Sequence, residues 1–242
     1  MNILEKPVSY EVDNTEHAGF VAWKDSSGPA PGVIIIHEWW GLNEYIKERA
    51  RQVAALGYTA FAIDMYGMGQ TGQNPDEAAN LMNGILENMD LGSQKLRVAY
   101  ETLCGMDQVN ETRTAAMGYC FGGAMALHMA RMGLPLSAVA AFHAALGAFV
   151  TAEPGTIKPK ILVCHGADDA MVSMDDVASF KQEMDQAQAD YEVLVHADAQ
   201  HGFTNPEADE NCKKFGVPLG YQAKADQESW NAMSTLYSSQ LG

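Results

Sequence analysis

Short apolar runs alternate with longer amphipathic stretches along nearly the whole chain, and this alternation restricts the fold more than any other feature. GVIIIH at residues 32–37 is a continuous run rich in β-branched residues, typical of a strand buried on both faces. NEYIKERARQVAALG at 43–57 follows it, with apolar residues at helical spacing and a final glycine as a stop signal. Repetition of this unit predicts a mostly parallel central sheet with helices on both faces.

The remaining elements expected from the same patterns extend this alternation to the end of the chain. Strands are expected at 58–64, 112–118, 136–143, 159–166 and 191–197, with an opening pair of strands around 9–12 and 19–23; helices are expected at 75–88, 93–104, 124–133, 174–189 and about 221–239. No repeat or Pro/Gly/Ser-rich linker divides the sequence, and its length is sufficient for a substantial core. Residues 1–242 are therefore predicted to form one domain.

Charge and composition exclude several classes of partner. The chain has 15 Lys and Arg against 31 Asp and Glu, a formal net charge of −16, which disfavours binding to nucleic acid or to anionic membrane surfaces. The N-terminal stretch does not resemble a signal peptide, and no window approaches the roughly 20 apolar residues that span a bilayer. We expect a soluble, cytoplasmic protein. The four cysteines lie far apart without a CxxC or HExxH motif, so neither a disulfide framework, a metal site nor a cofactor is expected.

Polar groups that can do chemistry are concentrated in six loops. In open α/β sheets, sites form at the carboxyl ends of the strands. The loops that follow the predicted strands read HEWWG, DMYGMGQ, GYCFGG, HAALG, HGADDAMV and HADAQHGF. The site is expected among these residues.

GYCFGG, residues 118–123, has the form of a nucleophile elbow with cysteine in place of serine. Glycines on both sides of the nucleophile remove side chains that would collide across the sharp turn from strand to helix. The motif stands between a predicted strand and a predicted helix, as the elbow requires. Cys120 is therefore the candidate nucleophile; the alternative is a small apolar residue that fills a tight turn.

A thiol nucleophile needs a base and a group that orients the base. In α/β-hydrolase order, an acid and a histidine follow the nucleophile along the chain. Asp169 in GADDAMV is the preferred acid, with its neighbour Asp168 as the alternative, and His201 on the last loop is the preferred base. His165 and His196 close strands and are expected to be core imidazoles with satisfied hydrogen bonds.

HEWWGL, GYCFGG, HGADDAMV and HGF together resemble the dienelactone hydrolase (carboxymethylenebutenolidase-like) family of α/β-hydrolases across nearly the whole chain. The resemblance implies an α/β-hydrolase fold and hydrolysis of esters or lactones through an acyl-enzyme. It gives Cys120, Asp169 and His201 the roles of the family's Cys-Asp-His triad. It also implies that Glu38 helps the resting thiol to lose its proton, although a salt bridge or a loop hydrogen bond would also explain a carboxylate there.

The surroundings of the triad follow from the same loops. The expected oxyanion hole combines the backbone N–H groups of Phe121 and Trp39. Trp40 and Phe203 are candidates for an apolar substrate pocket, with plain core packing as the alternative. The stretch 205–218 before the last helix is a candidate lid or rim of the pocket.

One departure from the family limits the substrate. Members that act on dienelactone bind its carboxylate through arginines, and the corresponding stretches here contain none. Arg97 and Arg131 are candidate substitutes, but both are expected on helices and exposed to solvent. We therefore expect a small ester or lactone substrate without assuming dienelactone. The competing hypotheses are a non-catalytic scaffold that binds a small molecule and an acyltransferase with the same triad; the sequence leaves the oligomeric state open.

Overall fold

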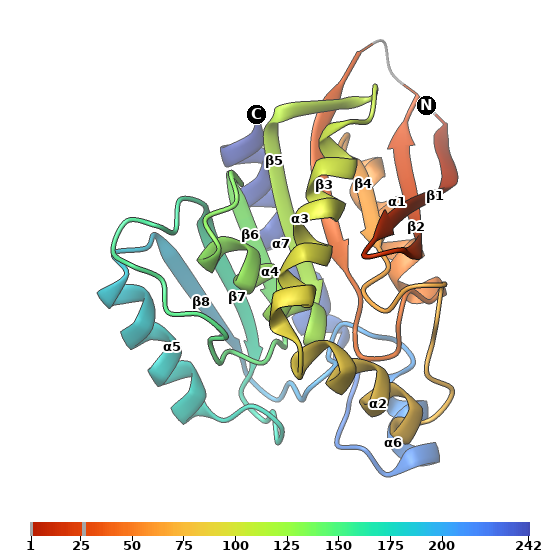
Figure 1. Ribbon diagram of the computed structural model, residues 1–242. Coiled ribbons are helices and arrows are strands. Elements are labelled where there is room, and N and C mark those ends of the chain that lie inside the picture. The colour runs from red at the N-terminus through yellow and green to blue at the C-terminus, as the bar shows by residue number, and fades with distance from the viewer. Residues whose placement is uncertain (1, 26–27) are drawn as a thin grey trace. The chain divides into compact units, whose positions relative to one another are not determined.

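The computed structural model describes residues 2–25 and 28–242 (Figure 1). The contacts within the chain divide it into two compact units. The first ends at Met117 and also takes in Leu241, and the second runs from Gly118 to Gln240 and takes in Gly242. Each unit is described by itself below, and the prediction of a single domain stays a prediction.

The strands of the first unit are mostly as the sequence predicts, with a longer opening hairpin. They are β1 (Ile3–Val12), β2 (Thr15–Lys24), β3 (Ala30–Ile36), β4 (Thr59–Ile63) and most of β5 (Val109–Tyr119), in the order β1-β2-β4-β3-β5. β3 and β4 are parallel, whereas β1 and β2 form an antiparallel hairpin. Asp13 and Asn14 connect β1 to β2 with φ values of 49° and 59°, which a two-residue turn of this kind requires. The tight turn keeps both strands paired over ten residues each.

Three helices complete the first unit, and asparagine caps each of them. α1 (Glu44–Ala55), α2 (Pro75–Leu86) and α3 (Met89–Cys104) follow Asn43, Asn74 and Asn88, whose side chains accept backbone N–H groups of the first turn. The Asn88 cap starts α3 four residues earlier than the apolar spacing predicts. α1 packs on β2 and β4, and α3 packs on β1 and β3; Figure 1 shows α3 in front of these strands and α1 behind them. Both faces are covered, as predicted.

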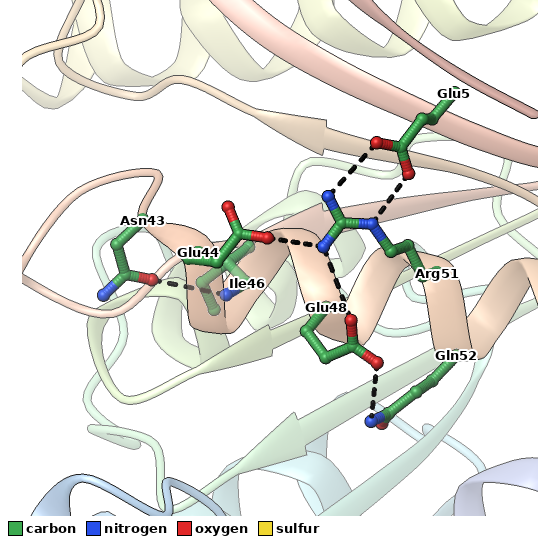
Figure 2. A network of polar contacts seen from close by, with 7 residues as sticks. All are labelled: Glu5, Asn43, Glu44, Ile46, Glu48, Arg51 and Gln52. Atoms are coloured by element: carbon green, nitrogen blue, oxygen red, sulfur yellow. Dashed lines mark hydrogen bonds and ion pairs between the residues drawn. The ribbon is translucent and has the colours of Figure 1, made fainter.

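Arg51 ties α1 to the edge strand β1. Its guanidinium forms a two-pronged ion pair with Glu5 (Nε–Oε2 2.7 Å, Nη2–Oε1 3.2 Å) and contacts Glu44 and Glu48 on its own helix (Figure 2). The guanidinium also lies over the ring of Phe20, 5.2 Å from its centroid. Because all three carboxylates are exposed, this network is expected to add little to the stability of the fold.

The second unit continues the strand–helix alternation. After the end of β5 it contains α4 (Phe121–Arg131), β6 (Ala138–Phe142), β7 (Lys160–Gly166), α5 (Met174–Gln186), β8 (Tyr191–His196), α6 (Ala208–Phe215) and α7 (Ala223–Leu241). β6, β7 and β8 pair in parallel. All eleven residues of α4 are buried. The observed pairing confirms the predicted mostly parallel α/β architecture, and only the short helix α6 is new.

No helix in the part of the chain that the structure describes is both long and apolar enough to cross a membrane.

Candidate active site

The elbow is built as a strained turn between β5 and α4. Cys120 has φ 53° and ψ −117°, a conformation that costs a non-glycine residue energy and persists only where its surroundings hold it. Its backbone N–H donates to the Phe142 carbonyl of β6 (3.0 Å). A Cβ at Gly118 would overlap the Gly122 carbonyl, and one at Gly123 would lie 2.6 Å from the Ala144 Cβ. Glycine is therefore required on both sides of the half-buried thiol.

Asp169 and His201 meet in the same unit as Cys120. A hydrogen bond of 2.8 Å joins Nδ1 of His201 to Oδ2 of Asp169, and both side chains are almost fully buried. The other carboxylate oxygen, Oδ1, accepts the backbone N–H groups of Met171 (2.8 Å) and Val172 (2.9 Å). Asp168, the alternative acid, is exposed. The aspartate is thus fixed at both oxygens, and it fixes the ring of the histidine.

Cys120 also affects the pKa of His201. Burial alone lowers the pKa of His201, but the influence of the neighbouring Cys120, the hydrogen bond to Asp169 and the charge of Asp169 together raise that pKa to about 10. Burial raises the pKa of Asp169, yet the hydrogen bond and charge of His201 and the two backbone N–H groups hold it below its usual value. The buried carboxylate of Asp169 therefore favours a proton on the imidazole of His201.

The residues expected around the triad divide between the two units. Phe121 opens α4 in the second unit, so its N–H lies at the positive end of that helix. Glu38, Trp39 and Trp40 follow β3 in the first unit, where Glu38 and Trp40 are buried and the two indole rings lie 4.9 Å apart. The Tyr66 hydroxyl donates to the Trp39 carbonyl (2.7 Å), which fixes this loop.

Phe203 corrects one expectation. Its side chain is fully buried, and its ring packs between His143 (5.3 Å between centroids) and His196 (5.4 Å). A ring enclosed in this way supports its neighbours and does not present a surface to a substrate. Its apolar character alone could not distinguish these two uses.

The stretch 205–218 contains α6, of which only Ala208 is buried. Beyond this helix the chain returns to the loop of the base: the Gly220 N–H donates to the His201 carbonyl (3.1 Å), and the Gln222 N–H donates to the Phe203 carbonyl (3.1 Å). These bonds brace the backbone on which His201 stands. A role as lid or rim stays a prediction.

His165 differs from the expectation of a satisfied core imidazole. It is 1% exposed, and neither ring nitrogen has a hydrogen-bond partner among residues 2–25 and 28–242. His196 is only partly satisfied, through a 3.4 Å contact of Nδ1 with Glu228. Burial lowers the pKa of His165 below its ordinary 6.5; the charges of Asp169 and Asp176 oppose this in part, and the charge of His201 adds to it.

A pH dependence of stability follows from His165. The pKa of His165 is lower in the folded than in the unfolded chain. The neutral imidazole therefore stabilises the fold fully above pH 6.5, the unfolded value, and this stabilisation is lost as the pH falls below 6.5 and through the lower pKa of the folded chain. We expect the free energy of unfolding of His165→Phe to decline less than that of the wild type between pH 7 and pH 5. Urea titrations at several pH values measure this. Parallel declines in the two proteins would contradict it.

Arg131 is the second correction, because it is buried rather than exposed. Its guanidinium makes two bonds of 2.7 Å to the Glu183 carboxylate on α5 and donates to the Leu146 carbonyl (2.9 Å). Only 1% of its side chain is accessible. The arginine links α4 to α5 and is not available to bind a substrate carboxylate. Arg97 is exposed on α3, as expected.

Loss of the Glu183 carboxylate is expected to destabilise the protein, because the Arg131 charge would stay buried without its partner. We expect Glu183→Gln to lower the free energy of unfolding by about 3 kcal/mol. The exposed pair Lys160–Asp190 (3.8 Å) provides the control, with a loss of less than about 0.5 kcal/mol for Asp190→Asn. Urea denaturation of both variants measures the difference, and equal losses would contradict the assignment.

Within the described ranges, no group of three or more His, Cys, Asp or Glu side chains could hold a metal ion.

Comparisons with known proteins agree along nearly the whole chain. The sequence model of the Dienelactone hydrolase family matches residues 17–241. A solved dienelactone hydrolase-like promiscuous phosphotriesterase from metagenomic libraries is 35% identical, with a TM-score of 0.94 over 99% of each chain. The solved structure m3DLH is 32% identical, with a TM-score of 0.93 over 99% of each chain. Protein usf of Aquifex pyrophilus is 27% identical over 238 residues, 97% of this chain and 98% of the relative. These likenesses confirm the predicted α/β-hydrolase fold.

Proposed function

This chain belongs to the dienelactone hydrolase family, whose members are hydrolases of small molecules, and from that premise we propose that it cleaves carboxylic esters or lactones through a thioester on Cys120. The observation that carries the proposal is the Asp169–His201 hydrogen bond of 2.8 Å, together with the effect of Cys120 on the same imidazole. A nucleophile, a base and a group that orients the base are the requirements of covalent acyl transfer.

In the proposed reaction, His201 carries each proton. Nε2 of His201 takes the thiol proton of Cys120, and the sulfur bonds to the carbonyl carbon of the substrate while the carbonyl electrons move to oxygen. The tetrahedral intermediate expels the alkoxide, which takes the proton from His201, and a thioester remains. His201 then removes a proton from water as the water attacks the thioester. The carboxylic acid leaves, and the proton returns to the sulfur.

The oxyanion of the intermediate needs donors that are already in place. The N–H of Phe121 is the proposed first donor, and it has the positive end of α4 behind it. The N–H of Trp39 is the proposed second donor, and Trp40 the proposed apolar lining for the acyl group. Glu38 is proposed to assist ionisation of the thiol. If so, Glu38→Gln should slow alkylation of Cys120 by iodoacetamide.

The substrates proposed here are uncharged esters and lactones. Arginines expected for a substrate carboxylate are absent from the corresponding stretches, and Arg131 is engaged by Glu183. Recognition of a carboxylate in a buried site needs such a charged partner. A matched panel of lactones and p-nitrophenyl esters, with and without a carboxylate, should therefore favour the uncharged members; a clear preference for the anionic ones would contradict this.

A second candidate activity is hydrolysis of phosphotriesters. A relative that is 35% identical over 99% of both chains is described as a promiscuous phosphotriesterase. A phosphotriester is uncharged and also presents an oxygen that gains negative charge on attack, so one oxyanion hole can serve both substrate classes. Adding a p-nitrophenyl phosphotriester to the panel tests this candidate separately.

The acyl-enzyme itself is the decisive species. Wild-type protein mixed with p-nitrophenyl acetate and quenched in acid should gain the mass of one acetyl group, which peptide mapping should locate on Cys120. Turnover without this adduct, or an adduct on another residue, would refute the mechanism. A non-catalytic scaffold would show neither turnover nor selective alkylation of Cys120 by iodoacetamide. An acyltransferase would give more ester or amide than acid when alcohols or amines compete with water.

A further inference from the structure

The end of strand β6 contacts both the nucleophile and the base of the proposed triad. The Phe142 carbonyl accepts the backbone N–H of Cys120 (3.0 Å). The next residue, His143, lies edge-on to the ring of His201, with 5.2 Å between the centroids and 67° between the planes. Two consecutive residues therefore contact two members of the triad. The sequence places His143 at the start of HAALG, one of the six candidate loops, but gives it no role of its own.

His143 is held in an unusual conformation. Its φ is 39°, in the left-handed region that side chains other than glycine rarely adopt, and its side chain is fully buried. Its N–H donates to the Cys164 carbonyl of β7 (2.8 Å), so the peptide group between Phe142 and His143 is held at both its carbonyl and its N–H. Backbone strain of this kind persists where the surrounding structure maintains it, and it concentrates at functional sites.

The imidazole of His143 is anchored by a hydrogen bond to the loop of the base. Nε2 of His143 and Oγ1 of Thr204 are 2.7 Å apart, and both groups are buried. Thr204 comes three residues after His201, and Phe203 between them packs edge-on against His143 as well (5.3 Å). His143 therefore contacts the loop that carries His201 at Thr204 and Phe203, and it also packs against the ring of His201 itself.

We propose that His143, anchored by Thr204, is a positioning residue that holds the ring of His201 at the angle needed to take the proton of Cys120. This inference rests on the proposed function of the triad. His143 is fully buried, so it acts through His201 without touching the substrate. Its contact restricts the rotation of the ring about the axis set by the His201–Asp169 bond, which the aspartate alone leaves free. Misplacement of a base by a fraction of an ångström is sufficient to slow proton transfer.

The test compares paired variants. Thr204→Val removes the hydroxyl at nearly constant shape, Thr204→Ser retains the hydroxyl, and His143→Phe retains a ring without its hydrogen-bonding nitrogens. We expect kcat to fall about 10-fold to 100-fold in His143→Phe and Thr204→Val, with KM within about twofold of the wild-type value. Thr204→Ser should stay within about threefold of wild type.

A spectroscopic measurement separates positioning from catalysis. The proton between His201 and Asp169 should give a low-field NMR signal, and we expect that signal to broaden or shift in His143→Phe and Thr204→Val but not in Thr204→Ser. Unchanged kcat in the folded variants, or an equal loss in Thr204→Ser and Thr204→Val, would overturn the inference. A wild-type protein without turnover that depends on Cys120 would refute the proposed function. In that case, an unchanged NMR signal of His201 in His143→Phe and Thr204→Val would by itself overturn the positioning role.

Discussion

Replacing Cys120 by alanine is expected to lower kcat for p-nitrophenyl ester hydrolysis by about 10⁴-fold or more, since no thioester can form without the sulfur. The residual rate would come from water held near His201 and from the oxyanion donors. The alanine variant should fold like the wild type. It keeps the elbow glycines, and its side chain is smaller than that of cysteine in the same strained turn. Steady-state kinetics with circular dichroism as a check on folding measure the effect.

Cys212→Ala is the matched control for this prediction. Cys212 is a half-buried thiol on α6 and makes no part of the proposed triad. Its loss should leave kcat within about twofold of wild type. Similar turnover in the wild type and in Cys120→Ala would instead remove Cys120 from the mechanism and favour direct attack by water.

Asp169→Asn is expected to lower kcat by about 10³-fold to 10⁴-fold, although it changes a single atom of the side chain. The reason lies in the two backbone N–H groups of Met171 and Val172, which require an oxygen opposite them. That requirement turns the new amide group toward His201, where it donates to Nδ1. The imidazole must then carry its proton on Nε2, so this nitrogen cannot accept the proton of Cys120.

Asp168→Asn controls for the loss of one negative charge nearby. Asp168 is exposed, and its backbone N–H donates to the Ala199 carbonyl. The kcat of Asp168→Asn should therefore stay within about twofold of the wild-type value. The rate of alkylation of Cys120 by iodoacetamide should fall in Asp169→Asn and not in Asp168→Asn. Equal effects of the two substitutions would mean that charge, and not the orientation of His201, accounts for the role of the aspartate.

The sequence predicts the fold and the pairing of Asp169 with His201 for a common physical reason. Glycines at 118 and 123 and the strand-to-helix context specify one backbone path, and the chain order then selects Asp169 and His201 as partners. These features are local and leave a pattern of residue types. The starting point of α3 was missed because its cap, Asn88, lies outside the apolar periodicity.

The residues that sequence reasoning missed depend on contacts between distant segments. His143 and Thr204 are 61 positions apart, and nothing in either loop indicates the other. Arg131 looks like a basic residue at the end of a helix, where exposure is the ordinary expectation, until Glu183 is brought opposite it by the packing of α5. Partners of this kind become visible only when the segments meet in space.

The complete burial of α4 has a consequence for anyone who wishes to alter this protein. A helix without a solvent face has no position where a substitution is free, since each larger or polar side chain must displace a packed neighbour. Random mutagenesis of residues 121–131 should therefore yield mostly unfolded protein, and the few survivors should be near-isosteric. Substitutions in the exposed loop around Phe149 and Val150 should perturb the fold less.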